Sequence, residues 1–146
     1  MALLTITKND VYVEVAKTTS YTGLKMDGDS YERIFTTDED QTLLDRFWEE
    51  GKSIVCNSLK RFLSSEEEAG EVFKLTLDLS KSFDDNQLDS MQQSLFSFFV
   101  MSITSKWYAF TNKPDAAEYS VSATSYLDDI IRKAYFKKKP TRPTYN

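Results

Sequence analysis

The longest helical pattern in the chain runs from Leu88 to Phe110. Its apolar residues recur every three or four positions, the spacing that places side chains on one face of an α-helix. Between Leu95 and Met101, apolar residues fall on nearly every side, so neighbouring elements must cover most of this helix. The pattern therefore predicts a central helix. The repeating residues are Leu88, Met91, Leu95, Phe98, Phe99, Ile103 and Trp107.

A second apolar stripe predicts a helix from Thr37 to Leu63. Acidic residues follow Thr37 directly, and negative charge is favourable at the positive end of a helix. Gly51 lies within the stripe, so we expect it to permit close approach to the central helix. The stripe consists of Leu44, Phe47, Trp48, Gly51, Val55, Leu59 and Phe62.

A third stripe predicts a final helix after Pro114. Because a residue before proline disfavours helical geometry, the central helix should end near Asn112. The chain then restarts at Pro114 or Asp115 and continues to about Phe136, which gives a helical hairpin. We expect the buried face of the final helix to carry Ala117, Val121, Thr124, Leu127, Ile131 and Ala134.

The pattern is less clear before Thr37. Residues 8–17 favour a short helix that buries Val11 and Val15, although alternating valines are also typical of a strand. Gly, Asp and Ser residues in Thr18 to Thr36 indicate an exposed connection. Aromatic side chains are expected to anchor this connection, namely Tyr21, Tyr31 and Phe35.

One segment alternates with the period of a half-buried strand. Phe73, Leu75, Leu77 and Leu79 are separated by polar residues. A strand needs a partner, and the candidates are Leu3 to Ile6 or a strand of a neighbouring subunit. Ser64 to Gly70, with three consecutive glutamates, is interpreted as a solvated loop or a frayed end of the preceding helix.

Together these patterns predict a mainly α fold. Residues 1–136 form one small helical domain with a central long helix, a C-terminal helical hairpin and a minor β element. Residues 137–146 contain two prolines and almost no core-forming side chains, so they are expected to be a flexible basic tail.

Composition removes several classes of function. The chain has no histidine and one cysteine, Cys56, so it offers no imidazole base, no intrachain disulfide and no cysteine or histidine zinc site. No glycine-rich phosphate-binding pattern is present. Paired acids at Asp84 and Asp85, and at Asp128 and Asp129, are interpreted as helix caps or polar-face residues. We therefore expect no enzyme activity, no metal and no cofactor.

Location follows from the same features. The first ten residues lack a basic start and a long apolar run, and serines and a lysine interrupt the apolar part of the central helix. Neither export nor membrane insertion is expected, and the single cysteine suits a reducing compartment.

Charge is distributed unevenly along the chain. Residues 132–146 hold six positive charges and no acid, so the net charge of −5 for the whole chain leaves −11 for residues 1–131. Such a tail can neutralise phosphates of a nucleic acid, order on an acidic protein groove, or only aid solubility. The sequence leaves these three alternatives open. A cytoplasmic helical protein-interaction or nucleic-acid-binding module is thus one reading of the chain.

Two long segments resemble the small head-to-tail connector (adaptor) proteins of tailed bacteriophages. DEDQTLLDRFWEEGKSIVCNSLKRF is similar to the acid-capped helix of that family, which has the pattern DDxLLxxxIxxAxxxIxxxL. VMSITSKWYAFTNKPDAAEYSVSATSYLDDIIRKAYF is similar to its closing hairpin, with Trp107 and Tyr108 at the position of a Trp-Tyr pair before a polar turn. The resemblance spans roughly Thr37 to Phe136.

The resemblance implies a structural protein of a phage or prophage particle. It would form a homo-oligomeric ring, commonly a dodecamer, between the portal protein and the tail or neck proteins, with genome DNA passing through its channel. Its location would be the neck of the virion, with assembly in the host cytoplasm. By analogy, the tail and closing helix would dock on the portal through Arg132, Lys133, Tyr135, Phe136, Lys137, Lys138, Lys139 and Arg142.

Overall fold

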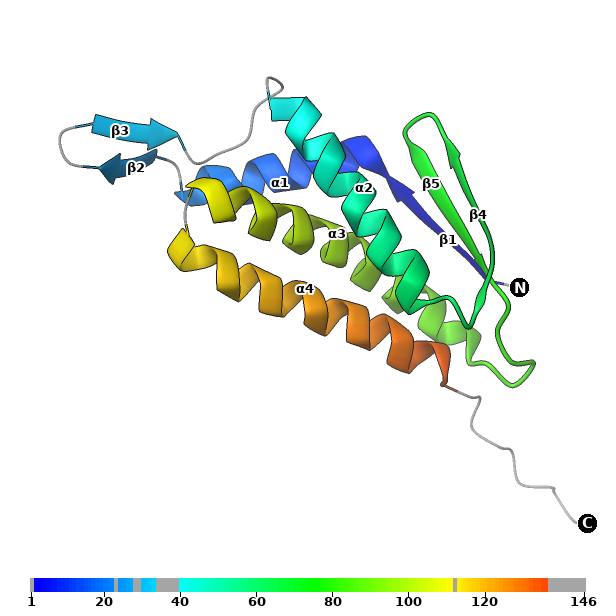
Figure 1. Ribbon diagram of the computed structural model, residues 1–146. Coiled ribbons are helices and arrows are strands. Elements are labelled where there is room, and N and C mark those ends of the chain that lie inside the picture. The colour runs from blue at the N-terminus through cyan, green and yellow to red at the C-terminus, as the bar shows by residue number, and fades with distance from the viewer. Residues whose placement is uncertain (1, 23, 28–29, 34–39, 112, 137–146) are drawn as a thin grey trace, which may run out of the picture.

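The computed structural model describes residues 2–22, 24–27, 30–33, 40–111 and 113–136 (Figure 1). Four α-helices account for most of them, and a small antiparallel sheet lies at one end of the helices. The mainly α fold with a minor β element is therefore confirmed. Along the chain the elements are β1 (Ala2–Thr7), α1 (Lys8–Thr22), β2 (Leu24–Asp27), β3 (Ser30–Arg33), α2 (Gln41–Ser58), β4 (Leu63–Ala69), β5 (Val72–Leu77), the 3-10 turn η2 (Asp85–Gln87), α3 (Leu88–Thr111) and α4 (Lys113–Ala134).

The predicted central helix is α3. It packs along its whole length against α4, and α1, α2 and β1 also lie against it. Its buried residues occupy several sides, as the apolar run around Leu95 to Met101 predicts. The helix begins at Leu88, directly after η2, and the side chain of Asp84 caps η2 by accepting a hydrogen bond from the amide of Asn86 at 3.1 Å. It ends at Thr111, beside the predicted end.

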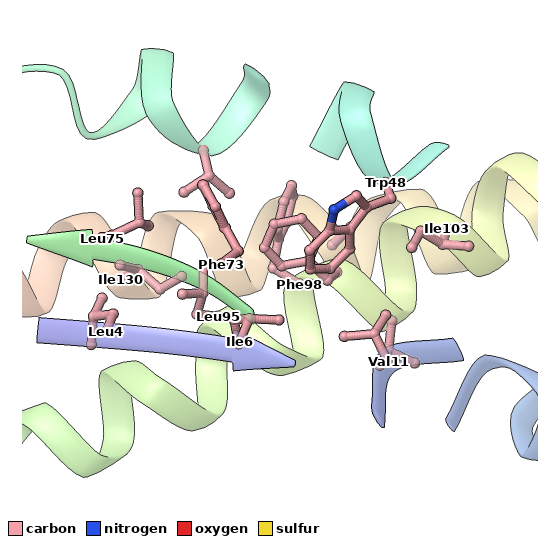
Figure 2. Packing of buried hydrophobic residues seen from close by; sticks show 14 of the residues in the cluster. Leu4, Ile6, Val11, Trp48, Phe73, Leu75, Leu95, Phe98, Ile103 and Ile130 are labelled. Carbon is pink, nitrogen blue, oxygen red and sulfur yellow. The ribbon is translucent and has the colours of Figure 1, made fainter. Parts of the chain in front are cut away.

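The contact between α2 and α3 depends on Gly51. A Cβ atom placed on Gly51 would lie only 3.0 Å from Cε1 of Phe99, so glycine lets the two helices approach closely. The ring centroids of Trp48 and Phe99 are 4.6 Å apart, and Phe73 of the sheet meets Trp48 edge-on. Figure 2 shows Trp48 above the central helix, with Phe73 and Ile6 beside it. This cluster joins the helices to the sheet.

The sheet has the strand order β1-β5-β4, and all its pairs are antiparallel. The predicted strand and its predicted partner are thus confirmed, because Leu4 lies opposite Leu75 and Ile6 opposite Phe73. One face of this pair is buried against the helices, as the alternation of β5 requires. In Figure 2, Leu4 and Leu75 point into the same core as Leu95 and Ile130.

The loop or frayed helix expected at Ser64 to Gly70 is wrong, because these residues form most of β4. This strand is exposed on both faces, so its sequence has no apolar alternation to reveal it. Backbone pairing with β5 and the contacts of Glu68 with Trp48 and Lys52 of α2 hold it in place. Gly70 makes the turn with a φ of 62°, a conformation that glycine adopts without strain.

Two helix boundaries also differ from the expectation. The first helix continues to Thr22, five residues beyond its predicted end. Thr19 is buried in this extension, and its hydroxyl donates to the Val15 carbonyl. The expected exposed connection therefore contains the end of α1 and the β2–β3 hairpin. The second helix ends at Ser58, and Leu63 already belongs to β4. The anchoring side chains expected in this connection, Tyr21, Tyr31 and Phe35, lie outside the described side chains.

The predicted buried face of α4 is right in its second half and wrong in its first. Ala134 is buried, and Leu127 and Ile131 are half-buried against the core. Val121 is 71% exposed, and Ala117 and Thr124 are exposed as well. A neighbouring side of the helix supplies the rest of the packed residues, namely Ala116, Tyr119, Ala123, Tyr126 and Ile130.

Candidate partner-binding site

The candidate site predicted from the sequence begins at the end of α4. In the structure, Arg132 and Lys133 there both contact the carboxylate of Asp129. Asp129 lies 2.7 Å from Arg132 Nη2 and 2.7 Å from Lys133 Nζ. The hydroxyl of Ser94 donates to the same carboxylate at 2.7 Å, and Lys133 also contacts Ser90. The lysine thereby ties α4 to α3.

These donors set the pKa of Asp129. Partial burial of the carboxyl would raise its pKa, but hydrogen bonds from Lys133, Ser94 and Arg132 outweigh that effect and lower the pKa to about 2. Asp129 is therefore ionised at neutral pH. Of the two basic residues beside it, Arg132 remains the more accessible, with a side chain 67% exposed against 14% for Lys133.

Tyr135 and Phe136 fix the direction in which the chain leaves α4. The ring of Tyr135 meets Phe62 edge-on at 4.9 Å between centroids, and its hydroxyl accepts a hydrogen bond of 3.2 Å from Arg61. The carbonyl of Phe136 accepts a hydrogen bond of 3.1 Å from the amide of Asp84. Half of Tyr135 remains exposed. The exit point is thus anchored to the turn after α2 and to the start of η2.

The other four candidate residues, Lys137, Lys138, Lys139 and Arg142, lie outside the described residues, as does the whole of 137–146. The structure therefore describes half of the candidate site, at the end of α4 and just after it. The positive charge of this half is partly neutralised by Asp129.

Acidic side chains gather in a cleft between α2 and β4. Lys52 lies 2.9 Å from Glu49 and also bonds Glu68, and its ammonium is over the ring of Phe73. Burial lowers the pKa of Lys52, but hydrogen bonds to Glu68 and Glu49 raise it overall. The cleft measures about 340 Å³. Its ion pairs are internal to the fold and hold β4 on α2.

Cys56 lies in the same cleft, where its thiol donates to Glu66. Burial and the neighbouring carboxylate raise the pKa of the thiol to about 12. Since the thiolate is the reactive form, a thiol that is protonated at neutral pH is a weak nucleophile. The side chain is half-buried.

Sequence reasoning missed two grooves that flank α3. The α2–α4 groove, of about 210 Å³, has walls from Ile54, Thr124 and Leu127 and a floor from Phe98 and Ser102. The β1–α3 groove, of about 400 Å³, is lined by Thr5, Ile6, Thr7, Asp10, Gln93, Phe96 and Ser97, among others. A helix has 3.6 residues per turn, so the two sets of α3 residues lie on opposite sides of that helix.

Within the described residues, no three acidic or cysteine side chains come together as a metal site. Asp84 caps η2, as its interpretation proposed, whereas Asp129 contacts Ser94 of α3 and pairs with Arg132 and Lys133 instead of lying on a polar face. Trp107 is buried, and Lys106 next to it lies 2.6 Å from Glu50. None of the helices described here has the length and apolarity needed to cross a bilayer.

No family model matches the chain, and searches among curated proteins and solved structures also gave no match.

Proposed function

We propose that the chain is a structural subunit that joins the head of a tailed phage or prophage particle to its tail. In this proposal copies of the chain form a closed ring beneath the portal, and the basic segment at the C-terminus binds the portal. The sequence resemblance over residues 37–136 motivates it, and the shape of the subunit is what supports it best.

A ring made of one chain needs two different surfaces on each copy, because each subunit contacts one neighbour in front and another behind. The two grooves on opposite sides of α3 meet this requirement. They also differ in character: Ile54, Phe98 and Leu127 make one groove mainly apolar. The other is mixed, because Asp10 and Gln93 lie there beside Phe96. This pair of unlike surfaces is the observation on which the proposal depends.

The end of α4 supports the second half of the proposal. Tyr135 and Phe136 are held by Phe62 and Asp84, so Phe136 has the same fixed position in every copy. In a ring, identical basic segments would then be presented around one circle. Many weak contacts made together give a high overall affinity without a deep pocket in the partner.

The test is co-expression of the full chain with the portal protein of the same genome. We expect the two proteins to purify together, with negative-stain images that show a ring of this chain on one end of the portal. Replacing Lys137, Lys138 and Lys139 by glutamine should weaken the complex and make it more sensitive to salt. A matched control replaces Lys60, Lys74 and Lys81, which lie on other elements, by glutamine.

A chain that stays off the portal under these conditions contradicts the proposal. So does a complex that survives the Lys137–Lys139 substitutions unchanged, since the basic segment would then make no contribution to docking.

A further inference from the structure

The two edges of the three-stranded sheet differ in how their backbone groups are paired. β1 forms one edge, where the side-chain amide of Gln92 bonds both the N–H and the C=O of Thr5, with 2.8 Å from the Thr5 amide to Oε1. A glutamine side chain thus takes the place of a neighbouring strand. β4 forms the other edge (Figure 1), and residues Ser64 to Ala69 are all exposed. Among the described residues, their backbone partners come from β5 alone.

The hairpin turn defines which residues of β4 face outward. Ala69 and Val72 flank a two-residue turn, and bonded and non-bonded pairs alternate from such a turn along an antiparallel ladder. Glu67 and Ala69 therefore bond β5, whereas Glu66 and Glu68 direct their N–H and C=O groups away from the sheet. Exposed groups of this kind form hydrogen bonds with an added extended segment.

The end of α4 lies beside the start of this edge. Tyr135 meets Phe62, the residue before β4, with 4.9 Å between ring centroids. Ten residues follow Phe136. An extended strand advances about 3.3 Å per residue, so ten residues span roughly 33 Å, against about 23 Å for the seven residues of β4. The C-terminal segment therefore starts next to β4 and is long enough to run along its whole edge.

Charge favours this segment as the occupant. Residues 137–146 carry four basic side chains and no acidic one. The cleft beside β4 is lined by four carboxylates and one ammonium, and Lys74, across the sheet from Glu67, reduces the excess to two negative charges. Within the part of the chain that the structure describes, Glu67 makes no hydrogen bond or ion pair, so its carboxylate is available to a cation. Opposite charges on adjacent strands stabilise their pairing.

The prolines of the segment permit one register. Pro140 has no N–H, and proline is tolerated in an edge strand where the N–H would point to solvent. With Pro140 facing outward, residues 137, 139 and 141 direct their backbone groups toward β4. The next residue of that series is Pro143, which ends the pairing.

We propose that residues 137–142 pair with the outer edge of β4 of the same chain as a parallel fourth strand. The direction is parallel because both segments start at the same end of the sheet. A segment tethered beside its site has a high effective concentration there, so weak pairing is sufficient. The pairing does not rest on the proposed function. It adds that a basic segment held by β4 has to be released before it binds any other partner.

Hydrogen exchange measured by NMR tests the pairing in the full-length chain. The amides of Glu66 and Glu68 should exchange at least about tenfold more slowly than amides of an unpaired strand edge. The amide of Glu67, which bonds β5, is the internal control. Lys139→Pro should abolish the slowing because it removes an N–H that faces β4, whereas Lys138→Pro should preserve it. The two variants lose the same charge and differ only in the side of the strand that they change.

Each other outcome overturns the proposal. Fast exchange of the Glu66 and Glu68 amides in the wild type means that the edge is unoccupied. Equal effects of Lys138→Pro and Lys139→Pro contradict pairing as a strand in this register. Slowing that appears only when the protein concentration is raised assigns the edge to the segment of a second copy. None of these measurements involves a portal, so their failure is distinguishable from failure of the proposed function.

Discussion

The two helices of the C-terminal hairpin are nearly equal in length and differ in how they are covered. In α3, 11 of 24 residues are buried, on several sides of the helix. Among the described residues of α4, full burial is reached only by Ala123, Ile130 and Ala134. α3 has neighbours on most sides, whereas α4 packs chiefly against α3 and barely reaches α2.

This difference shows what an amphipathic pattern can and cannot predict. The apolar residues of α4 extend around the helix beyond the face that α3 covers. A period of three and four identifies that the helix has an apolar face, but it does not indicate how wide a face one neighbour will bury. Apolar residues of α4 that α3 leaves exposed, such as Val121, make this helix a candidate for contacts with another molecule.

The largest expected effect separates the two faces of α4. Ile130→Ala removes a fully buried side chain and should lower the free energy of unfolding by about 2–5 kcal/mol. Val121→Ala removes an exposed one and should change the monomer by less than about 0.5 kcal/mol. Urea denaturation at low protein concentration measures both. Equal losses for the two variants would mean that Val121 is buried in the monomer, contrary to its exposure in the structure.

A smaller effect is expected where α3 is covered most closely. Gly51→Val places side-chain atoms against the ring of Phe99, which lies 3.0 Å from the position of a Cβ at residue 51. Overpacking of this kind costs about 1–3 kcal/mol. Gly51→Ala should fall between the wild type and the valine variant, because alanine also favours the helix. Melting curves give the order, and a valine variant as stable as the wild type would refute the close approach.

The smallest effect concerns the ion pairs that join α4 to α3. Asp129→Asn should cost about 1 kcal/mol at neutral pH, because hydrogen bonds to a charged group are lost in a partly exposed site. The folded-state pKa of Asp129, about 2, lies below its ordinary value of 3.8, so this contribution is present above pH 4 and disappears as the pH falls toward 2.

Urea denaturation of both proteins across that pH range measures the effect. The difference between wild type and Asp129→Asn should be constant above pH 5 and should shrink toward zero near pH 2. Asp128→Asn, on the exposed side of the same turn, is the control and should follow the wild type. A difference that persists unchanged at pH 2 would exclude the carboxylate as its source.

Much of the fold could be predicted because its elements carry strong periodic signals. The central helix, the α2 stripe and the pairing of residues 3–6 with the strand after Val72 all follow from apolar spacing. β4 could not be predicted in this way, since Glu66 to Glu68 are exposed and pair with β5 without any apolar alternation in the sequence. The buried face of α4 was wrong in its first half for a different reason, because apolar residues lie on two neighbouring sides of this helix.

The candidate site was predicted in part. Basic and aromatic residues at the end of α4 stand out in the sequence, but only the fold shows that Asp129 holds Arg132 and Lys133 and that Phe62 holds Tyr135. The grooves beside α3 combine residues from three elements each, so no local pattern could reveal them.

The most direct test of the proposed ring is the mass of the full chain by light scattering over a range of concentrations, alone and with the portal protein of the same genome. Assembly into a ring predicts a discrete mass many times the 16.9 kDa of one chain, alone or added to the mass of the portal. A chain that stays at 16.9 kDa at every concentration and adds no mass to the portal contradicts the proposal.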